Sequence, residues 1–117
     1  MYHPVTERLA LAGAPAPDPT QEYTRATALE DKNAVMFVVW LVASNGAVSV
    51  KVFLEGSTDL CNWSPITDLT VSTVPSYTAS ATTGILPWAF VRLRYEVTSA
   101  SSFSVFIRAG IETTTTT

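Results

Sequence analysis

Apolar and polar residues alternate along most of the chain after position 20, which is the pattern of β-strands that bury one face. β-Branched and aromatic residues are frequent, turn residues recur about every ten positions, and no long stretch keeps a helical period. The pattern predicts strands over residues 22–29, 34–44, 47–55, 66–74, 76–82, 90–99 and 103–112. So many short strands in one small domain indicate an all-β fold, an antiparallel β-sandwich or jelly roll of about seven to eight strands.

The first twenty residues have a different composition. They contain Pro4, Pro15, Pro17 and Pro19, and the alternating Ala-Pro segment lacks backbone donors that a sheet or helix needs. We therefore predict an extended Pro-rich N-terminal arm over residues 1–20, with a short helix over residues 5–12 as the alternative for its start. The β-sandwich domain follows over residues 21–112, and a threonine tail over residues 113–117 either frays or extends the last strand.

A tight turn is predicted at Asn45-Gly46, the favoured pair for a two-residue type I′ hairpin. In this register residues 48, 50, 52 and 54 lie opposite residues 43, 41, 39 and 37. Because side chains alternate across a strand, all eight share one face, which is the predicted core. The other face of the hairpin is also apolar, and its large side chains are Met36, Val38, Trp40 and Phe53.

This second apolar face needs a cover. Its four large side chains offer on the order of 400 Å² of apolar surface, near the upper range that a monomer leaves open. The N-terminal arm, a partner subunit and a ligand groove are competing covers, and a different strand register is a further explanation. The partner-subunit interpretation predicts a homo-oligomer with Met36, Val38, Trp40 and Phe53 in its interface.

The last two predicted strands alternate in the ordinary way. Residues 91, 93, 95 and 97 share one face, and Arg92, Arg94 and Glu96 share the other. Residues 103, 105, 107 and 109 of the final strand point inward, so the two hairpins supply the two inner faces of a sandwich. Glu96, flanked by Arg92 and Arg94, is predicted to form a cross-strand charge pair on a solvated or subunit-facing surface.

The segment LEGSTDLCNWSPI, residues 54–66, joins a strand end to a Gly-Ser turn and an Asn-Trp pair. Gly56 supplies backbone freedom, Asp59 and Asn62 bond local amides, and Trp63 plugs an open end of the sandwich. The segment is therefore predicted to be a structural corner.

Two short motifs resemble those of known β-sandwiches. The turn GSTDLCNW resembles a turn of discoidin-like carbohydrate-binding sandwiches, and together with FVRLRYEV, residues 90–97, it resembles small β-sandwich virion proteins of phage and prophage. The resemblance covers residues 48–111. The virion comparison implies a head-decoration, head-fibre or related assembly protein without catalysis. The discoidin comparison implies recognition of a sugar or lipid headgroup by end loops, but the chain lacks the cysteine pair that often ties the discoidin termini.

Trp63, Tyr77 and Trp88 are the candidate ligand-binding residues of a carbohydrate-binding alternative, because flat aromatic faces suit sugar rings. The simpler interpretation places these side chains in the core and at the ends of the sandwich, where Trp88 seals the strand that follows it. Asp59 and Asp68 do not belong to a dense carboxylate loop of the kind that binds calcium. No metal and no cofactor is therefore predicted.

Composition narrows the classes of function further. The chain has 117 residues, of which 47% are hydrophobic and 15% charged, which suits one domain with a real core. A net charge of -3, with only 7 Lys and Arg, argues against a nucleic-acid partner. His3 is the only histidine and Cys61 the only cysteine, so neither a nucleophile with its base nor an internal disulfide is predicted.

The expected function is therefore that of a non-enzymatic structural or assembly protein, a phage or virus-like particle component that binds itself and a capsid or other virion protein. A carbohydrate-binding module is the alternative. The start of the chain lacks the basic region of a signal peptide, and the longest apolar run, residues 34–43, is far shorter than the ~20 residues of a membrane-spanning helix. We expect a virion or cytoplasmic assembly without a membrane partner.

Overall fold

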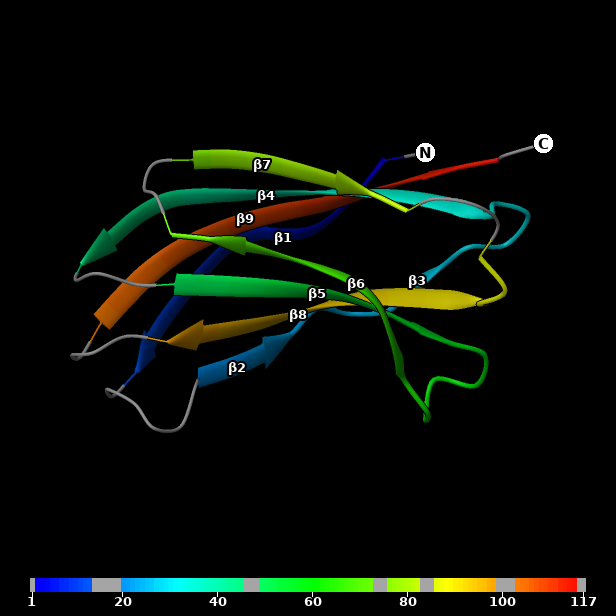
Figure 1. The fold of residues 1–117 in the computed structure, drawn as a ribbon, viewed down its shortest axis with the longest axis horizontal. Helices are drawn as coiled ribbons and strands as arrows, with labels where there is room; N and C mark the ends of the chain where they lie inside the picture. The colour runs from blue at the N-terminus through cyan, green and yellow to red at the C-terminus, as the bar shows by residue number, and fades with distance from the viewer. Residues whose placement is uncertain are drawn as a thin grey trace.

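Two antiparallel β-sheets lie face to face in the computed structural model, which describes residues 2–13, 20–45, 49–72, 76–82, 86–98 and 103–115 (Figure 1). The first, which we term sheet A, has the strand order β1-β9-β4-β7. The second, sheet B, has the order β2-β8-β5-β6, and the short β3 also pairs with β8. The prediction of an all-β antiparallel sandwich is confirmed.

The described residues form nine strands. Sheet A consists of β1 (Tyr2–Gly13), β9 (Phe103–Thr114), β4 (Ala34–Asn45) and β7 (Ser76–Ala81). Sheet B consists of β2 (Thr20–Tyr23), β3 (Thr27–Ala28), β8 (Phe90–Thr98), β5 (Ser49–Ser57) and β6 (Ser64–Val71). The single strand expected over residues 22–29 is divided at Thr24, whose hydroxyl accepts a hydrogen bond from the Leu93 amide at 2.9 Å.

The N-terminal segment contributes a strand to the sandwich. β1 runs antiparallel to β9, from Tyr2 opposite Glu112 to Gly13 opposite Phe103. The alternative of a helix over residues 5–12 is therefore wrong. The segment is extended, as expected of an arm, but over residues 2–13 it is paired within its own chain at the edge of sheet A. At the other terminus β9 continues to Thr114, two residues beyond the predicted end of the domain.

The hairpin predicted at Asn45-Gly46 is wrong. β4 pairs with β9 and β7 in sheet A, whereas β5 pairs with β8 and β6 in sheet B. The chain therefore passes from one sheet to the other between β4 and β5, and residues 46–48 of the predicted turn lie outside the described residues. The two strands lie in opposite layers of the sandwich instead of side by side (Figure 1).

The core consists of alternate residues from both sheets. The inward side chains of the four central strands are buried: Phe37, Val39, Leu41, Val50, Val52, Leu54, Val91, Leu93, Tyr95, Val97, Val105, Ile107, Ala109 and Ile111. Each large apolar side chain among them stabilises the fold by on the order of 1.5–3 kcal/mol. Ala43 was also expected inside but is exposed, because the pairing of β4 with β9 shifts register between Leu41 and Ala43.

Trp88 packs against one inward position near the end of this core. A Cβ atom built on Gly56 would lie 2.4 Å from Cγ of Trp88. Gly56 is paired within β5 to Ser64 and Val91, and its φ angle is not in the left-handed region. The glycine is thus required for the close approach of the indole ring, and the backbone freedom expected from a turn is not what it supplies.

Candidate functional site

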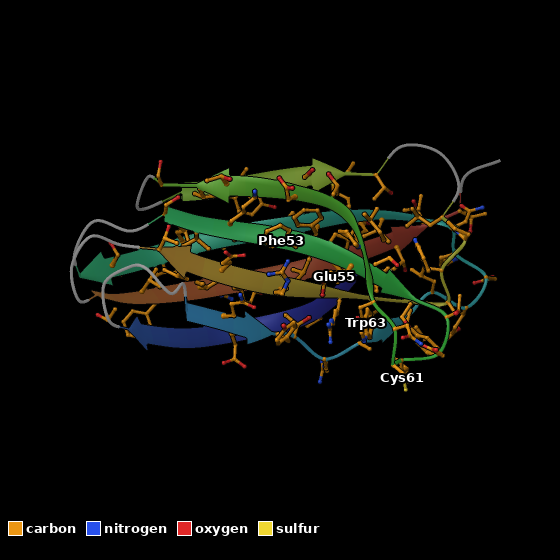
Figure 2. The ribbon with its side chains drawn as sticks, turned by 60° about the horizontal axis from the view of Figure 1, so that its bottom comes forward. Phe53, Glu55, Cys61 and Trp63 are labelled. Atoms are coloured by element: carbon orange, nitrogen blue, oxygen red, sulfur yellow. The ribbon has the colours of Figure 1, made fainter. Side chains whose placement is uncertain are left out.

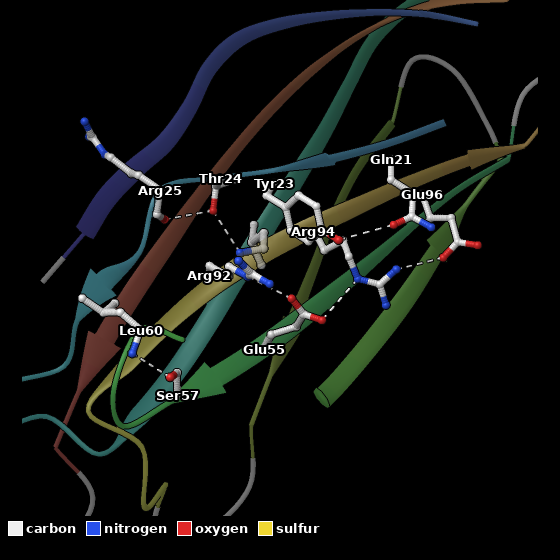
Figure 3. Close-up of polar contacts among 11 residues, drawn as sticks. Gln21, Tyr23, Thr24, Arg25, Glu55, Ser57, Leu60, Arg92, Arg94 and Glu96 are labelled. Carbon is white, nitrogen blue, oxygen red and sulfur yellow. Dashed lines mark hydrogen bonds and ion pairs between the residues drawn. The ribbon is translucent and has the colours of Figure 1, made fainter. Parts of the chain in front are cut away.

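The outer face of sheet B carries a network of paired charges (Figure 3). Glu55 is only 8% exposed, and its two carboxylate oxygens accept hydrogen bonds from Nε of Arg92 at 3.0 Å and Nε of Arg94 at 3.2 Å. Arg94 also donates from Nη1 to Glu96 at 3.1 Å. Cross-strand charge pairs are present on this face, but their acceptor is Glu55 of β5, which is the centre of the network, whereas the predicted partner Glu96 pairs with Arg94 along the same strand.

Aromatic rings cover both arginines of this network. The guanidinium of Arg92 lies 4.4 Å from the centroid of the Tyr23 ring and 4.1 Å from that of Trp63. The guanidinium of Arg94 lies 3.9 Å from the Phe53 ring centroid. Cation–π contacts of this kind contribute roughly 0.5–2 kcal/mol each, more where water is excluded. Figure 2 shows Phe53, Glu55 and Trp63 on this side of the molecule.

The charges at the centre of the outer face of sheet B are paired within the chain, although Tyr23 beside them is 48% exposed. The carboxylates and guanidinium groups of Glu55, Arg92, Arg94 and Glu96 bind one another, and Phe53 and Trp63 are only half-exposed beneath cations. Among the side chains that the structure describes, the sequence pattern gave no sign of the Tyr23–Arg92–Trp63 stack, because its members come from three separate strands or loops.

The outer face of sheet A has the opposite character. Trp40 of β4 is 45% exposed and Tyr77 of β7 is 61% exposed, and their rings meet edge to face at 5.5 Å. Met36, also on β4, is 38% exposed, and Val38 between them is half-buried. Arg108 of β9 lies with its guanidinium 5.3 Å from the Trp40 ring. On β4, β7 and β9 the described side chains of this face are therefore mostly aromatic and aliphatic, with few charges.

The four predicted interface residues are divided between the two outer faces. Met36, Val38 and Trp40 share the outer face of sheet A, because they alternate with buried positions of β4. Phe53 lies on the outer face of sheet B, where Lys51 and Arg94 contact its ring. They are divided because β4 and β5 lie in different sheets, whereas the predicted hairpin placed both strands in one sheet.

The N-terminal segment does not cover the apolar face over its described residues 2–13. β1 lies in the plane of sheet A, and β9 separates it from β4. Trp40 and Tyr77 remain exposed at the opposite side of the sheet. Over its described residues, the N-terminal segment therefore does not act as the predicted cover of this face.

The turn after β5 is held together by Asp59. Its Oδ1 accepts hydrogen bonds from the amides of Asn62 at 2.8 Å and Cys61 at 2.9 Å, and from the Ser57 hydroxyl at 3.0 Å. These backbone bonds, above all that from Asn62, hold the pKa of Asp59 well below its usual range. The expected bonding of local amides is present, and Leu60 at the tip adopts a left-handed conformation with φ of 66°.

The three aromatic residues of the carbohydrate alternative lie in three different places. Trp63 is on the outer side of sheet B against Arg92, Tyr77 is on the outer face of sheet A, and Trp88 packs on Gly56. Trp63 thus does not take the plugging position expected for it. The fold does not bring the three rings to one platform.

Within the residues that the structure describes, no group of three or more His, Cys, Asp or Glu side chains is placed to hold a metal ion. Asp59 lies in the turn and Asp68 on β6, opposite Phe53. No described part of the chain forms a helix long and apolar enough to cross a membrane. Cys61 is a free, exposed thiol in the turn (Figure 2).

Comparison with known proteins identifies the fold but not a family. No protein-family model matches the chain, and no curated protein matches its sequence. A chain of the infectious bursal disease virus Gt strain has a TM-score of 0.62 at 5% identity, over 95% of this chain and 31% of that one. A D431N mutant VP2 protein of the same virus, from derived T=1 particles, has a TM-score of 0.59 at 8% identity, over 97% and 31%.

A third similar structure, PirA, has a TM-score of 0.55 at 7% identity, over 91% of this chain and 92% of that one. The chain thus spans about a third of the length of the viral chains and most of the length of PirA. At these identities the likeness is one of fold. The structures of similar fold thus include a VP2 protein from virus-derived T=1 particles, in agreement with the β-sandwich expected from the virion resemblance.

Proposed function

We propose that the protein is a non-enzymatic assembly protein, a virion or virus-like particle component of decoration or head-fibre type that associates through the outer face of sheet A. The observation that carries the proposal is the contrast between the two outer faces. On sheet B, Glu55, Arg92 and Arg94 are paired within the chain, and the exposed ring of Tyr23 is stacked on Arg92, whereas sheet A leaves Trp40, Tyr77 and Met36 exposed on neighbouring strands. Large contiguous apolar patches on a small protein mark interaction surfaces.

The size of this face suits a stable protein interface. A strand of 12 residues such as β4 is about 40 Å long, and four strands spaced about 4.8 Å apart are about 19 Å wide. Allowing for the shorter β7, the face measures on the order of 700 Å². Each partner of a standard interface buries about 800 Å², so a partner that covers sheet A gains an interface of ordinary size.

The shared fold also supports the proposal. Part of a VP2 protein of infectious bursal disease virus, from derived T=1 particles, has a similar β-sandwich fold. Trp40 at the middle of an open sheet face is the kind of central aromatic anchor on which such interfaces depend. Association with copies of the same chain, or with another protein of the particle, would bury it.

The test is the oligomeric state of the purified protein and of two matched variants. Sedimentation velocity from about 1 to about 100 µM covers dissociation constants near the micromolar range. Trp40→Glu places a charge on the outer face of sheet A, and Thr70→Glu places the same charge on an exposed outer position of sheet B. Circular dichroism and urea unfolding establish that both variants are folded.

We expect the wild-type protein to associate and Trp40→Glu to weaken association at least about tenfold, since a central interface tryptophan contributes about 2 kcal/mol or more. Thr70→Glu should associate as the wild type does. A wild-type protein that stays monomeric over the whole range, or a Trp40→Glu variant that associates unchanged, contradicts the proposal.

A further inference from the structure

We infer that the outer face of sheet A binds the same face of a second copy, through a twofold axis that lies between the stacked sheets and runs across the strands. The axis follows the row formed by Ala79, Val38 and Gly110. The inference rests on the proposed assembly function and names its partner and geometry: an isologous dimer of this chain.

The pairing of the strands arranges this face in three rows. The central row is Ala79, Val38 and Gly110, which are neighbours across β7, β4 and β9. A second row lies two residues away along each strand and consists of Tyr77, Trp40 and Arg108. The third row lies two residues away in the opposite direction and consists of Ala81, Met36 and Glu112. All three rows lie on one face, because side chains two residues apart point the same way.

A twofold axis along the central row lays each strand antiparallel over the same strand of the partner. Arg108 then faces Glu112 of the partner subunit, and the symmetry repeats this ion pair. Trp40 faces Met36 of the partner subunit, a favourable contact between a thioether and an aromatic ring. The central row consists of small side chains, of which Gly110 is buried and Val38 half-buried, so the two sheets can approach closely there.

The charges on this face are what select the second copy as the partner. Arg108 and Glu112 are the charged residues of this face among the described side chains, and neither forms an ion pair with another described side chain. On the outer face of sheet B, by contrast, Glu55, Arg92 and Arg94 are paired within the chain. On the described part of this face, one positive and one negative charge, placed symmetrically about Gly110, match a copy of the same surface turned end for end.

Other twofold arrangements lack this match. An axis parallel to the strands and over β9 sets Arg108 against Arg108 of the partner subunit, which is repulsive. An axis parallel to the strands and between β9 and β4 sets Glu112 against Met36 of the partner subunit, which removes a carboxylate from water without a counter-charge. Of the three arrangements, the axis across the strands pairs both charges.

The distances are compatible with the pairing. Arg108 and Glu112 are four residues apart on β9, so each is about 7 Å from the axis at about 3.4 Å per residue. Stacked sheets are about 10 Å apart and inclined by about 30°, which displaces the partner's strand sideways by roughly 3–4 Å at that distance. An extended arginine side chain facing a glutamate spans such a gap.

Charge reversal tests the geometry. Arg108→Glu and Glu112→Arg are each measured alone and as an equimolar mixture by sedimentation velocity, with Lys51→Glu as the control for a charge reversal on the outer face of sheet B. In a homodimer each single reversal creates two repulsive contacts. In the mixed dimer both contacts are attractive again, because the subunit that carries Arg108→Glu presents two carboxylates and the subunit that carries Glu112→Arg presents two guanidinium groups.

We expect each reversal to weaken self-association at least about tenfold, and the mixture to recover to within about threefold of the wild type, because like charges at an interface cost several kcal/mol. Lys51→Glu should leave association unchanged. If a reversal reduces folding, Arg108→Gln and Glu112→Gln replace it: each homodimer loses both ion pairs, whereas their mixture keeps one.

The outcomes separate this inference from the proposed function. If the wild-type protein does not associate, both fail. If Trp40→Glu abolishes association but the charge reversals have no effect, or their mixture does not recover, assembly through sheet A stands and the twofold pairing of Arg108 with Glu112 is wrong.

Discussion

The contact between Gly56 and Trp88 gives a sharp prediction for the stability of the fold. In Gly56→Ala the new Cβ lies 2.4 Å from Cγ and 2.5 Å from Cδ1 of the indole, whereas ordinary contacts begin at 3.4 Å. The ring must therefore retreat by about 1 Å, the difference between 2.4 and 3.4 Å. These are atoms at the base of the ring system, so no small rotation of a flexible end relieves the overlap. Overpacking of this kind costs about 1–3 kcal/mol.

The substitution also has a stabilising effect, which is smaller than the cost of overpacking. Alanine in place of glycine within a strand reduces the entropy of the unfolded chain by an equivalent of about 0.5–1 kcal/mol. We therefore expect Gly56→Ala to lower the free energy of unfolding by about 1–2 kcal/mol. With an m-value of about 1–2 kcal/mol/M for a chain of this size, the urea midpoint should fall by about 1 M.

Equilibrium unfolding in urea, followed by circular dichroism, measures this in four proteins: the wild type, Gly56→Ala, Trp88→Leu and the double variant. In the Trp88→Leu background the indole is gone, so the added methyl group should cost nothing or stabilise slightly. The coupling energy between the two positions should then be about 1–3 kcal/mol. Gly56→Ala with no cost in the wild type, or with the same cost in both backgrounds, refutes the reasoning.

Two further predictions concern polar groups. Glu55→Gln should lower the free energy of unfolding by about 1–3 kcal/mol, because the Glu55 side chain is only 10% exposed and bridges two arginines. Glu96→Gln should lower the free energy of unfolding by less than about 1 kcal/mol in the same urea assay, because the Glu96 side chain is more exposed than that of Glu55. Equal decreases in the two variants would contradict the central place of Glu55. The Asp59 carboxyl should titrate below the range of an ordinary aspartate when followed by NMR. Because its pKa is depressed in the folded state, its support of the turn is present above the unfolded pKa of about 3.9 and is lost as pH falls through the lower folded value. The protection of the Asn62 amide against hydrogen exchange should therefore be weaker in Asp59→Asn at neutral pH, and should equal that of the wild type only at strongly acidic pH; an Asp59 that titrates normally contradicts this.

The candidate site could be predicted in part. The apolar character of Met36, Val38 and Trp40, and their position opposite the core, followed from alternation along one strand. That Tyr77 and Arg108 flank Trp40 could not, because they lie on β7 and β9, which are distant in sequence and adjacent only through pairing. Their expected use as an interface stays a prediction.

The network on sheet B could not be predicted in full from the sequence either, because its members come from strands and turns that are distant in the chain. Arg92, Arg94 and Glu96 were expected to share an outer face, but their partner Glu55 lies on β5, which pairs with β8 instead of forming the predicted hairpin with β4. Trp63 reaches Arg92 from the turn after β5, and Tyr23 reaches it from β2. Neither of these contacts with Arg92 produces a pattern of alternating residues from which it could be predicted.

The sequence by itself determined that the protein is all-β and, apart from Ala43, which described side chains of the four central strands point inward. Alternation is a local property of extended backbone, so Phe37, Val39 and Leu41 face inward whatever strand lies beside them. Only the tertiary structure decided which strands pair with one another in each sheet. Asn45-Gly46 favours a hairpin by a small local energy, whereas setting β4 and β5 in opposite sheets lets their inward faces close one core. Burial of that core is a sum over residues far apart in the chain, and it outweighs the preference of a single turn.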